Sequence, residues 1–347
     1  MTLEAGVRPA PGVAPGLERV PVRTIIAAPI DGFVRLRPGD RPLVTAGETF
    51  SVGAALADIL RDGETREVAR ADPSAPGPDA RPGDRWSSLV DEGRPAGDGG
   101  SAELLYEVEG RWRVAAGDLV DRVEAPVSGI VRDVRPGVGI RIAAPARGLF
   151  GTEALGSPVR GRLEIAAPAG GELRAGAMDV GRRGTVLVVG ARVDAEVLTR
   201  ARAMGVRGIV VGSLASKERR DVLASDERQA AARHRIEPFG VLVLDGSLRR
   251  PIATPMMDVL RALAGREVGM LIDPPALVID DPEVALPTPS PELVRIRSGP
   301  HAGIEGRWLG LAGVRRFAAG VHLEAGRVAL ADGTTLTVAL ADLERFQ

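Results

Sequence analysis

Few residues of this chain have the types and spacing that enzyme chemistry requires. Three histidines, His234, His301 and His322, are widely separated and would have to converge from different segments to form a triad or a metal cage. Asp280 and Asp281 are adjacent carboxylates, but the proline-rich sequence that follows favours a linker over a buried acid–base pair. The sequence therefore predicts no catalytic residue and no metal site.

Two serines, Ser213 and Ser247, are candidate nucleophiles by residue type alone. Neither has a base at a recognisable spacing, and neither lies in the pattern of a nucleophile elbow. The chain has no cysteine, which excludes disulfides and thiolate metal sites. These observations leave an enzyme unsupported, and we expect a binding protein without a cofactor.

The middle of the chain alternates continuous apolar runs with helical patterns. Strands buried on both faces are expected at 185–189, 208–211, 240–244 and 267–272, and helices at 194–204, 216–234 and 254–264. This alternation predicts a small Rossmann-like α/β domain with a parallel sheet over residues 181–280.

Ligands of such sheets bind beyond the carboxyl ends of the strands. The residues expected at this crest are Gly190, Arg192, Gly212, Ser213, Asp245 and Gly246. Glycine amides, helix N-termini and an arginine suit an anion. However, no dinucleotide or Walker-type glycine pattern is present, and glycines after strands are ordinary turn residues. A small-molecule sensor or enzyme centred here is therefore the alternative hypothesis.

The C-terminal residues carry the most specific pattern. A β-branched run at 294–297 enters a corner rich in glycine and proline, and a new strand leaves through Trp308. The candidate contact residues of this corner are Ser298, Gly299, Pro300, His301, Gly303 and Gly306. Corners of this composition turn the chain sharply because glycine accepts positive φ and proline presets φ near −65°.

The residues after this corner predict further short strands. Alternating segments at 327–331 and 334–340 flank Asp332-Gly333, which is a strong hairpin signal. Other strands are expected at 306–311, 315–319 and 341–346. Five short strands in this length favour a small closed barrel.

The corner and its strands resemble the KOW motif of the transcription factor NusG and of certain ribosomal proteins. That resemblance covers residues 292–347 and implies an SH3-like barrel that binds a partner without doing chemistry. It also implies a role with the transcription or translation machinery, with the corner residues in contact. The domain with which NusG grips polymerase is not recognisable here, and another small β-barrel is the alternative fold.

The front of the chain contains three related stretches, at 28–34, 125–131 and, more weakly, 167–173. They resemble the barrel-sandwich hybrid of biotinyl and lipoyl carrier domains over residues 22–61 and 104–145. Such carriers attach their cofactor to a lysine, whereas Lys217 is the single lysine of this chain. The resemblance therefore implies a spacer or docking module without a cofactor, and a plain antiparallel sheet is the alternative.

The length of 347 residues predicts two or three domains. We expect a flexible tail at 1–20, a β-rich module at 21–180 with a mobile insertion at 62–102, the α/β domain at 181–280, a proline-rich linker at 281–291 and the barrel at 292–347. The insertion is expected to be mobile because its many prolines, glycines and aspartates bury too little apolar surface.

Charge and composition bear on the partner. The net charge is −1, and seven arginines face six acidic residues from Ser290 onward, whereas a duplex-binding surface is usually strongly basic. Aromatic residues make up 3% of the chain, which leaves few platforms for stacking bases. We therefore expect the partner to be a protein rather than a nucleic acid.

No apolar run is long enough to span a membrane and no signal peptide is evident, so a cytoplasmic location is expected. A structural subunit of a larger assembly is the third hypothesis.

Overall fold

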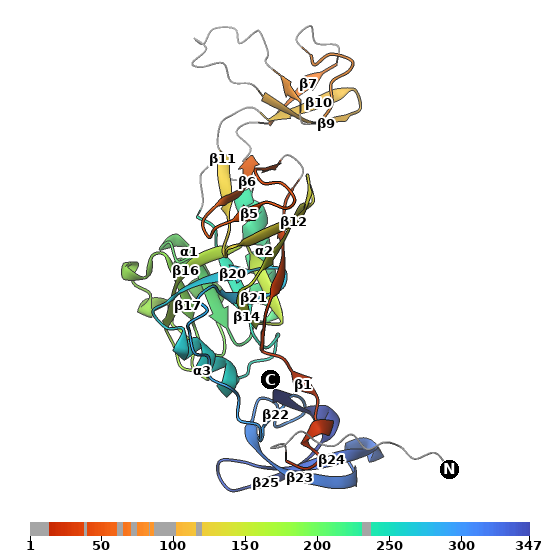
Figure 1. Ribbon diagram of the computed structural model, residues 1–347, viewed down its shortest axis with the longest axis vertical. Coiled ribbons are helices and arrows are strands. Elements are labelled where there is room, and N and C mark those ends of the chain that lie inside the picture. The colour runs from red at the N-terminus through yellow and green to blue at the C-terminus, as the bar shows by residue number, and fades with distance from the viewer. Residues whose placement is uncertain are drawn as a thin grey trace, which may run out of the picture.

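The computed structural model describes residues 14–37, 40–60, 65–70, 75–82, 84–86, 102–115, 120–230 and 237–347. Strands dominate these residues and form five sheets, and three α-helices accompany the largest sheet. The sheets follow one another along an elongated molecule, with the largest near its centre (Figure 1). This architecture agrees with the expected combination of an α/β part and β-rich parts. Within these residues, no helix is long and apolar enough to cross a membrane.

The central sheet has nine strands in the order β15-β19-β18-β17-β16-β20-β21-β14-β2. These strands are β2 (Ile26–Ala27), β14 (Arg147–Phe150), β15 (Glu153–Gly156), β16 (Val159–Ile165), β17 (Thr185–Val188), β18 (Gly208–Val211), β19 (Gly240–Val243), β20 (Glu267–Leu271) and β21 (Ala276–Ile279). The four neighbours β16 to β19 run parallel to one another, and the remaining pairs are antiparallel.

This sheet differs from the parallel sheet expected for residues 181–280. The strand expected at 267–272 is β20, and it pairs antiparallel with β16. The sheet also crosses the expected boundary at 180, because β14, β15 and β16 come from the preceding residues. In β16, buried and partly exposed residues alternate, a pattern that sequence reasoning assigns to a sheet with one solvated face.

The helices lie where the sequence periodicity predicted them. Helix α1 (Ala195–Ala203) begins after Asp194, whose carboxylate accepts a main-chain N–H of the first turn at 2.8 Å. It ends before Gly205, whose φ of 77° is costly for other residues. Helices α1 and α2 (Ser216–Ala230) pack on one face of the sheet, and α3 (Thr254–Ala262) packs on the other.

Two short 3₁₀ turns precede β17 on the chain. They are η2 (Ala175–Ala177) and η3 (Val180–Arg182). Alternate residues of β17, β18 and β19 enter the two cores, so each face of these strands is covered. The continuous apolar runs that predicted these strands follow directly from this double burial.

Two small antiparallel sheets form the front part of the chain and share one apolar core. The first contains β4 (Arg41–Pro42), β6 (Ala55–Leu60) and β11 (Val120–Glu124), and the second contains β3 (Ile30–Arg35), β5 (Thr49–Phe50), β12 (Gly129–Arg135) and β13 (Gly139–Ala144). Leu271 and Val278 of the central sheet belong to the same core, so the two parts are packed together.

A four-stranded sheet stands beyond β6 and β11 at one end of the molecule (Figure 1, top). Its strands are β7 (Thr65–Ala69), β8 (Arg85–Trp86), β9 (Ala102–Val108) and β10 (Arg111–Ala115). Because β7 and β8 fall within 62–102, the structure differs there from the expected mobile insertion. Val68 is buried against Leu104, Trp112 and Val114, which come after this segment in the sequence. The composition of residues 62–102 could not show the apolar core that these later residues supply. Residues 62–64, 71–74, 83 and 87–101 of the expected insertion lie outside the described residues.

The C-terminal sheet combines strands from both ends of the described chain, in the order β1-β26-β22-β23-β24-β25. Its strands are β1 (Val22–Arg23), β22 (Leu293–Ile296), β23 (Glu305–Arg316), β24 (His322–Ala329), β25 (Thr335–Ala339) and β26 (Leu343–Phe346). The 3₁₀ turns η4 (Ala318–Gly320) and η5 (Leu340–Asp342) follow β23 and β25. The strands expected at 306–311 and 315–319 are largely one strand, β23, which stays paired with β24 through two irregularities. Strands β1 and β25 lie at the two edges of this sheet, so among the described strands no hydrogen-bonded pair closes it into the expected barrel.

The N-terminal residues complete the core of this sheet. Leu17, in the 3₁₀ turn η1 (Leu17–Arg19), and Val20 are each 1% exposed and pack with Trp308. The indole N–H of Trp308 donates to the carbonyl of Pro15 at 3.2 Å. The structure thus differs from the expected flexible tail at residues 14–20, because two apolar side chains in that glycine- and proline-rich stretch are buried here.

Replacing Leu17 with alanine should lower the free energy of unfolding by about 2–5 kcal/mol, because it empties a fully buried position. Val22→Ala is the matched control, since Val22 is 44% exposed, and its effect should stay near 0.5 kcal/mol. Urea unfolding followed by tryptophan fluorescence measures both. Equal losses would contradict a structural role for the N-terminal segment in this core.

Candidate functional site

The corner after β22 is an ordered turn with one exposed side. The Ser298 hydroxyl donates to the Asp342 carboxylate, and the Gly303 N–H donates to the Ile296 carbonyl at 2.7 Å. Gly299 and Gly303 have φ values of 82° and 91°, as the turn chemistry predicted. Residues 298–301 are exposed, so this half of the corner is open to a partner.

The other half of the corner packs against the central domain. A side chain at Gly303 would meet the stem of Arg250 at 3.3 Å. The Glu305 carboxylate accepts the N–H of Thr254 at the start of α3, at 2.8 Å. Gly306 faces β24, where an added Cβ would lie 2.5 Å from the carbonyl of Ala329. The six predicted corner residues therefore divide into an exposed part, 298–301, and a packed part around Gly303 and Gly306.

The predicted crest lies at the carboxyl ends of β17, β18 and β19. The loop after β18 leads to α2 on one face of the sheet, and the loop after β19 leads to α3 on the other. Such a divergence is the topological switch point at which open α/β sheets bind ligands. Gly212 and Ser213 follow β18, and Asp245 and Gly246 follow β19, so four of the predicted crest residues lie at this point.

Two arginines of the C-terminal sheet bind the carboxylate of Asp245. Arg295 of β22 donates to one carboxylate oxygen at 2.5 Å, and Arg23 of β1 donates to the other at 2.9 Å. Glu344 of β26 lies 3.6 Å from Arg295 and 3.9 Å from Arg23. Two guanidinium groups and two carboxylates thus form one network between the central and C-terminal sheets.

This network is buried. The Arg295 side chain is 1% exposed and the Asp245 side chain is 8% exposed. Main-chain carbonyls add to it, because Arg295 donates to Pro251 at 3.1 Å and Arg23 donates to Leu244 at 2.5 Å. Removal of one partner from a buried pair leaves an uncompensated charge, which is strongly destabilising. The network therefore fixes the C-terminal sheet on the crest of the central sheet.

The remaining crest residues are engaged by neighbouring main chain. An added Cβ at Gly190 would lie 2.2 Å from the Gly171 carbonyl, so the preceding loop covers this glycine. The Ser213 hydroxyl is buried and donates to the Ala191 carbonyl at 2.7 Å. Arg192 lies 3.4 Å from Glu218 in the first turn of α2. The structure brings the predicted crest residues together, and the chain itself covers Gly190, Gly212 and Ser213, whereas the Arg192 side chain is 43% exposed.

The candidate chemical residues lie apart from one another. His301 is exposed in the corner, His322 is exposed at the start of β24, and His234 lies outside the described residues. Among the described residues, no group of three or more histidines and carboxylates could hold a metal ion. Ser247 is exposed in the loop after β19. The described ones among them, His301, His322 and Ser247, lie in three different segments of the chain.

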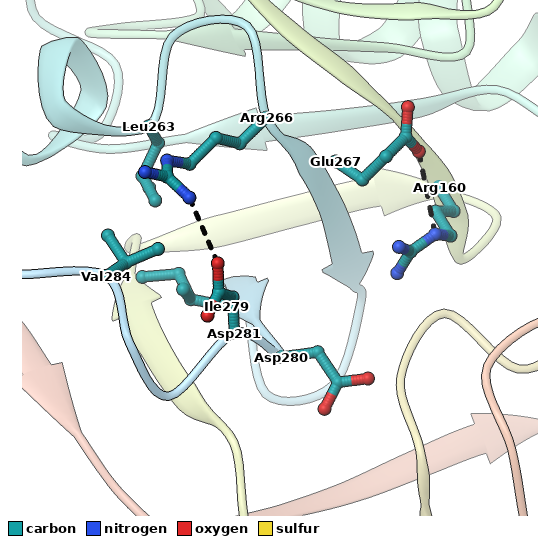
Figure 2. A pocket seen from close by; sticks show the side chains of 8 residues that line it. All are labelled: Arg160, Leu263, Arg266, Glu267, Ile279, Asp280, Asp281 and Val284. Carbon is teal, nitrogen blue, oxygen red and sulfur yellow. Dashed lines mark hydrogen bonds and ion pairs between the residues drawn. The ribbon is translucent and has the colours of Figure 1, made fainter.

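A shallow cavity of about 390 Å³ lies beside the end of β21 (Figure 2). Its charged side chains are mostly neutralised in pairs, with Arg266 on Asp281 at 3.0 Å and Arg160 on Glu267 at 3.5 Å. Asp280 points away from this pair and accepts two hydrogen bonds from Ser128. The adjacent carboxylates Asp280 and Asp281 therefore have different partners and do not act as an acid–base pair.

Sequence reasoning missed the residues that join the sheets. Arg23, Arg295 and Glu344 occur in short strands where alternation assigns charged residues to solvent. These residues are buried because a second sheet covers their strands, and no local sequence pattern predicts that contact. Compared with known proteins, the chain matches no protein-family model and no curated sequence.

Changing Asp245 to alanine should lower the free energy of unfolding by about 3–5 kcal/mol, because Arg295 and Arg23 lose their buried counter-charge. Asp258→Ala is the control: this carboxylate is 43% exposed and pairs with Arg261 at 2.9 Å, which is worth about 0–1 kcal/mol. Urea unfolding of the full chain measures both. A loss at Asp245 no larger than the loss at Asp258 would show that the network does not hold the sheets together.

Proposed function

We propose that this protein is a non-enzymatic, cytoplasmic adaptor that contacts a macromolecular partner through the corner at 298–306. The C-terminal part resembles a KOW-type barrel, and the resemblance favours a protein of the transcription or translation machinery as the partner. The other modules supply a rigid support for this contact.

The strand order of the C-terminal sheet supports the barrel resemblance. Strands β22 to β25 pair in succession, β26 returns beside β22, and the 3₁₀ turn η5 lies between β25 and β26 on the chain. Small SH3-like barrels have this succession of strands. The predicted corner falls between the first and second strands, where the KOW motif lies.

One observation carries the proposal: the corner is exposed on one side and anchored on the other. Residues 298–301 face solvent, while Glu305 and Gly303 contact the central domain. Arg295, which lies just before the corner, is held in the buried network. A recognition loop on a rigid support loses little conformational entropy when it binds.

The alternative of a small-molecule site at the crest has less support. Arg192, the charged group expected to bind an anion there, lies 3.4 Å from Glu218, and two arginines of the C-terminal sheet bind Asp245. A ligand at this position would have to displace Arg295 and the sheet that carries it. The front module carries no attachment lysine, so we assign it the role of a spacer between the central domain and the small sheet at the far end.

The proposal is tested with the full-length tagged chain on lysate of its native host. Proteins bound by the wild type should be lost from the double variant Pro300→Ala, His301→Ala, because the exposed half of the corner makes the contact. The matched control is Thr334→Ala, Thr335→Ala, which changes two exposed residues of the β24–β25 turn and should retain the same proteins.

Quantitative mass spectrometry of the bound fraction measures both variants. The absence of any protein enriched by the wild type, or equal recovery by both variants, would contradict the proposed contact. Recovery of ribosomal, polymerase or termination proteins would identify which machinery is involved.

A further inference from the structure

The loop after β19 and the corner after β22 form one continuous surface. The stem of Arg250 packs against Gly303, and Glu305 binds the N–H of Thr254. We call residues 247–250 and 297–304 together the loop–corner surface. It unites segments that are about fifty residues apart in the sequence, next to the exposed half of the corner.

Two of the three arginines on this surface have no ion-pair partner among the described residues. Arg249 pairs with Glu172 at 2.9 Å. Arg250 and Arg297, by contrast, have no side-chain hydrogen bond or ion pair within the described part of the chain. The neighbouring carboxylates of Glu305 and Asp342 accept hydrogen bonds from the Thr254 N–H and the Ser298 hydroxyl and form no ion pair with these two arginines. Two positive charges are therefore available to a partner.

Apolar side chains are exposed beside these charges. Leu248 is 63% exposed at the tip of its loop, and Ile304 is 39% exposed at the end of the corner. The surface contains no phenylalanine, tyrosine or tryptophan. Exposed apolar groups flanked by unpaired arginines suit a peptide with acidic and apolar side chains. Single-stranded nucleic acid, which binds largely through stacking on aromatic rings, fits this surface less well.

We propose that the loop–corner surface binds an acidic peptide segment of the partner. Carboxylates of that segment contact Arg250 and Arg297, and an apolar side chain packs on Leu248. This inference rests on the proposed function, because it assumes a partner at the corner, and it adds the chemical class of the segment that is recognised.

The test uses the full-length chain and fluorescence anisotropy with a short labelled peptide of alternating glutamate and leucine. The wild type should bind it, and binding should weaken as salt is raised. The double variant Arg250→Gln, Arg297→Gln should bind at least about tenfold more weakly, because two charge-assisted contacts are lost. Leu248→Ser should weaken binding without changing its salt dependence.

The matched control is Arg315→Gln, Arg316→Gln, which removes the same charge from two exposed arginines of β23. It should bind the peptide as the wild type does. A peptide in which glutamine replaces glutamate should bind none of the proteins. Thermal unfolding of each variant verifies that the fold is retained, as expected for changes at these surface positions.

Three outcomes would overturn the inference: no binding of the peptide to the wild type, equal loss in both arginine variants, or preferential binding of a single-stranded RNA probe that depends on Arg250 and Arg297. The inference is separable from the proposed function. A host partner that is lost from the Pro300, His301 variant but retained by the Arg250, Arg297 variant would uphold the corner contact and refute the acidic-peptide recognition.

Discussion

The buried pairing of Arg295 with Asp245 is the interaction on which the C-terminal half of the molecule depends. It joins a strand of the C-terminal sheet to the carboxyl end of the central sheet, and Arg23 and Glu344 balance its charge. Buried ion pairs add little net stability compared with apolar packing, but they strongly disfavour arrangements that leave a charge unpaired. The four residues come from both ends of the chain and from its middle, so they select one docked arrangement.

This docking changes the meaning of both predicted sites. The crest resembles a ligand site when the central sheet is considered alone, but in the whole molecule the C-terminal sheet packs against it. The corner gains a rigid base, because Gly303 and Glu305 pack against the loop that leads to α3. As a result the corner and the loop after β19 form one surface, with Leu248 and residues 297–301 exposed and Arg250 partly exposed.

Local signals predicted the local structure well. The three helices and the Asp332-Gly333 turn depend on residues that are close together in the sequence, and each lies where the sequence indicated. Arg295 and Arg297 show the limit of such reasoning. Alternation assigns both to the same face of a strand, yet Arg295 is 1% exposed and Arg297 is exposed, because only the first meets the central sheet. Leu17 was missed for the same reason, since its contacts lie with Trp308 at the other end of the chain.

Native-state hydrogen exchange of the full chain tests the central claim, the docking of the two sheets, most directly. If the buried network joins them, the amides of β22, of β26 and of the loop at 245–254 open together, with one free energy and one dependence on denaturant. Fast exchange of β22 and β26 while the loop and β19 remain protected would show that the C-terminal sheet moves independently, which would contradict the account.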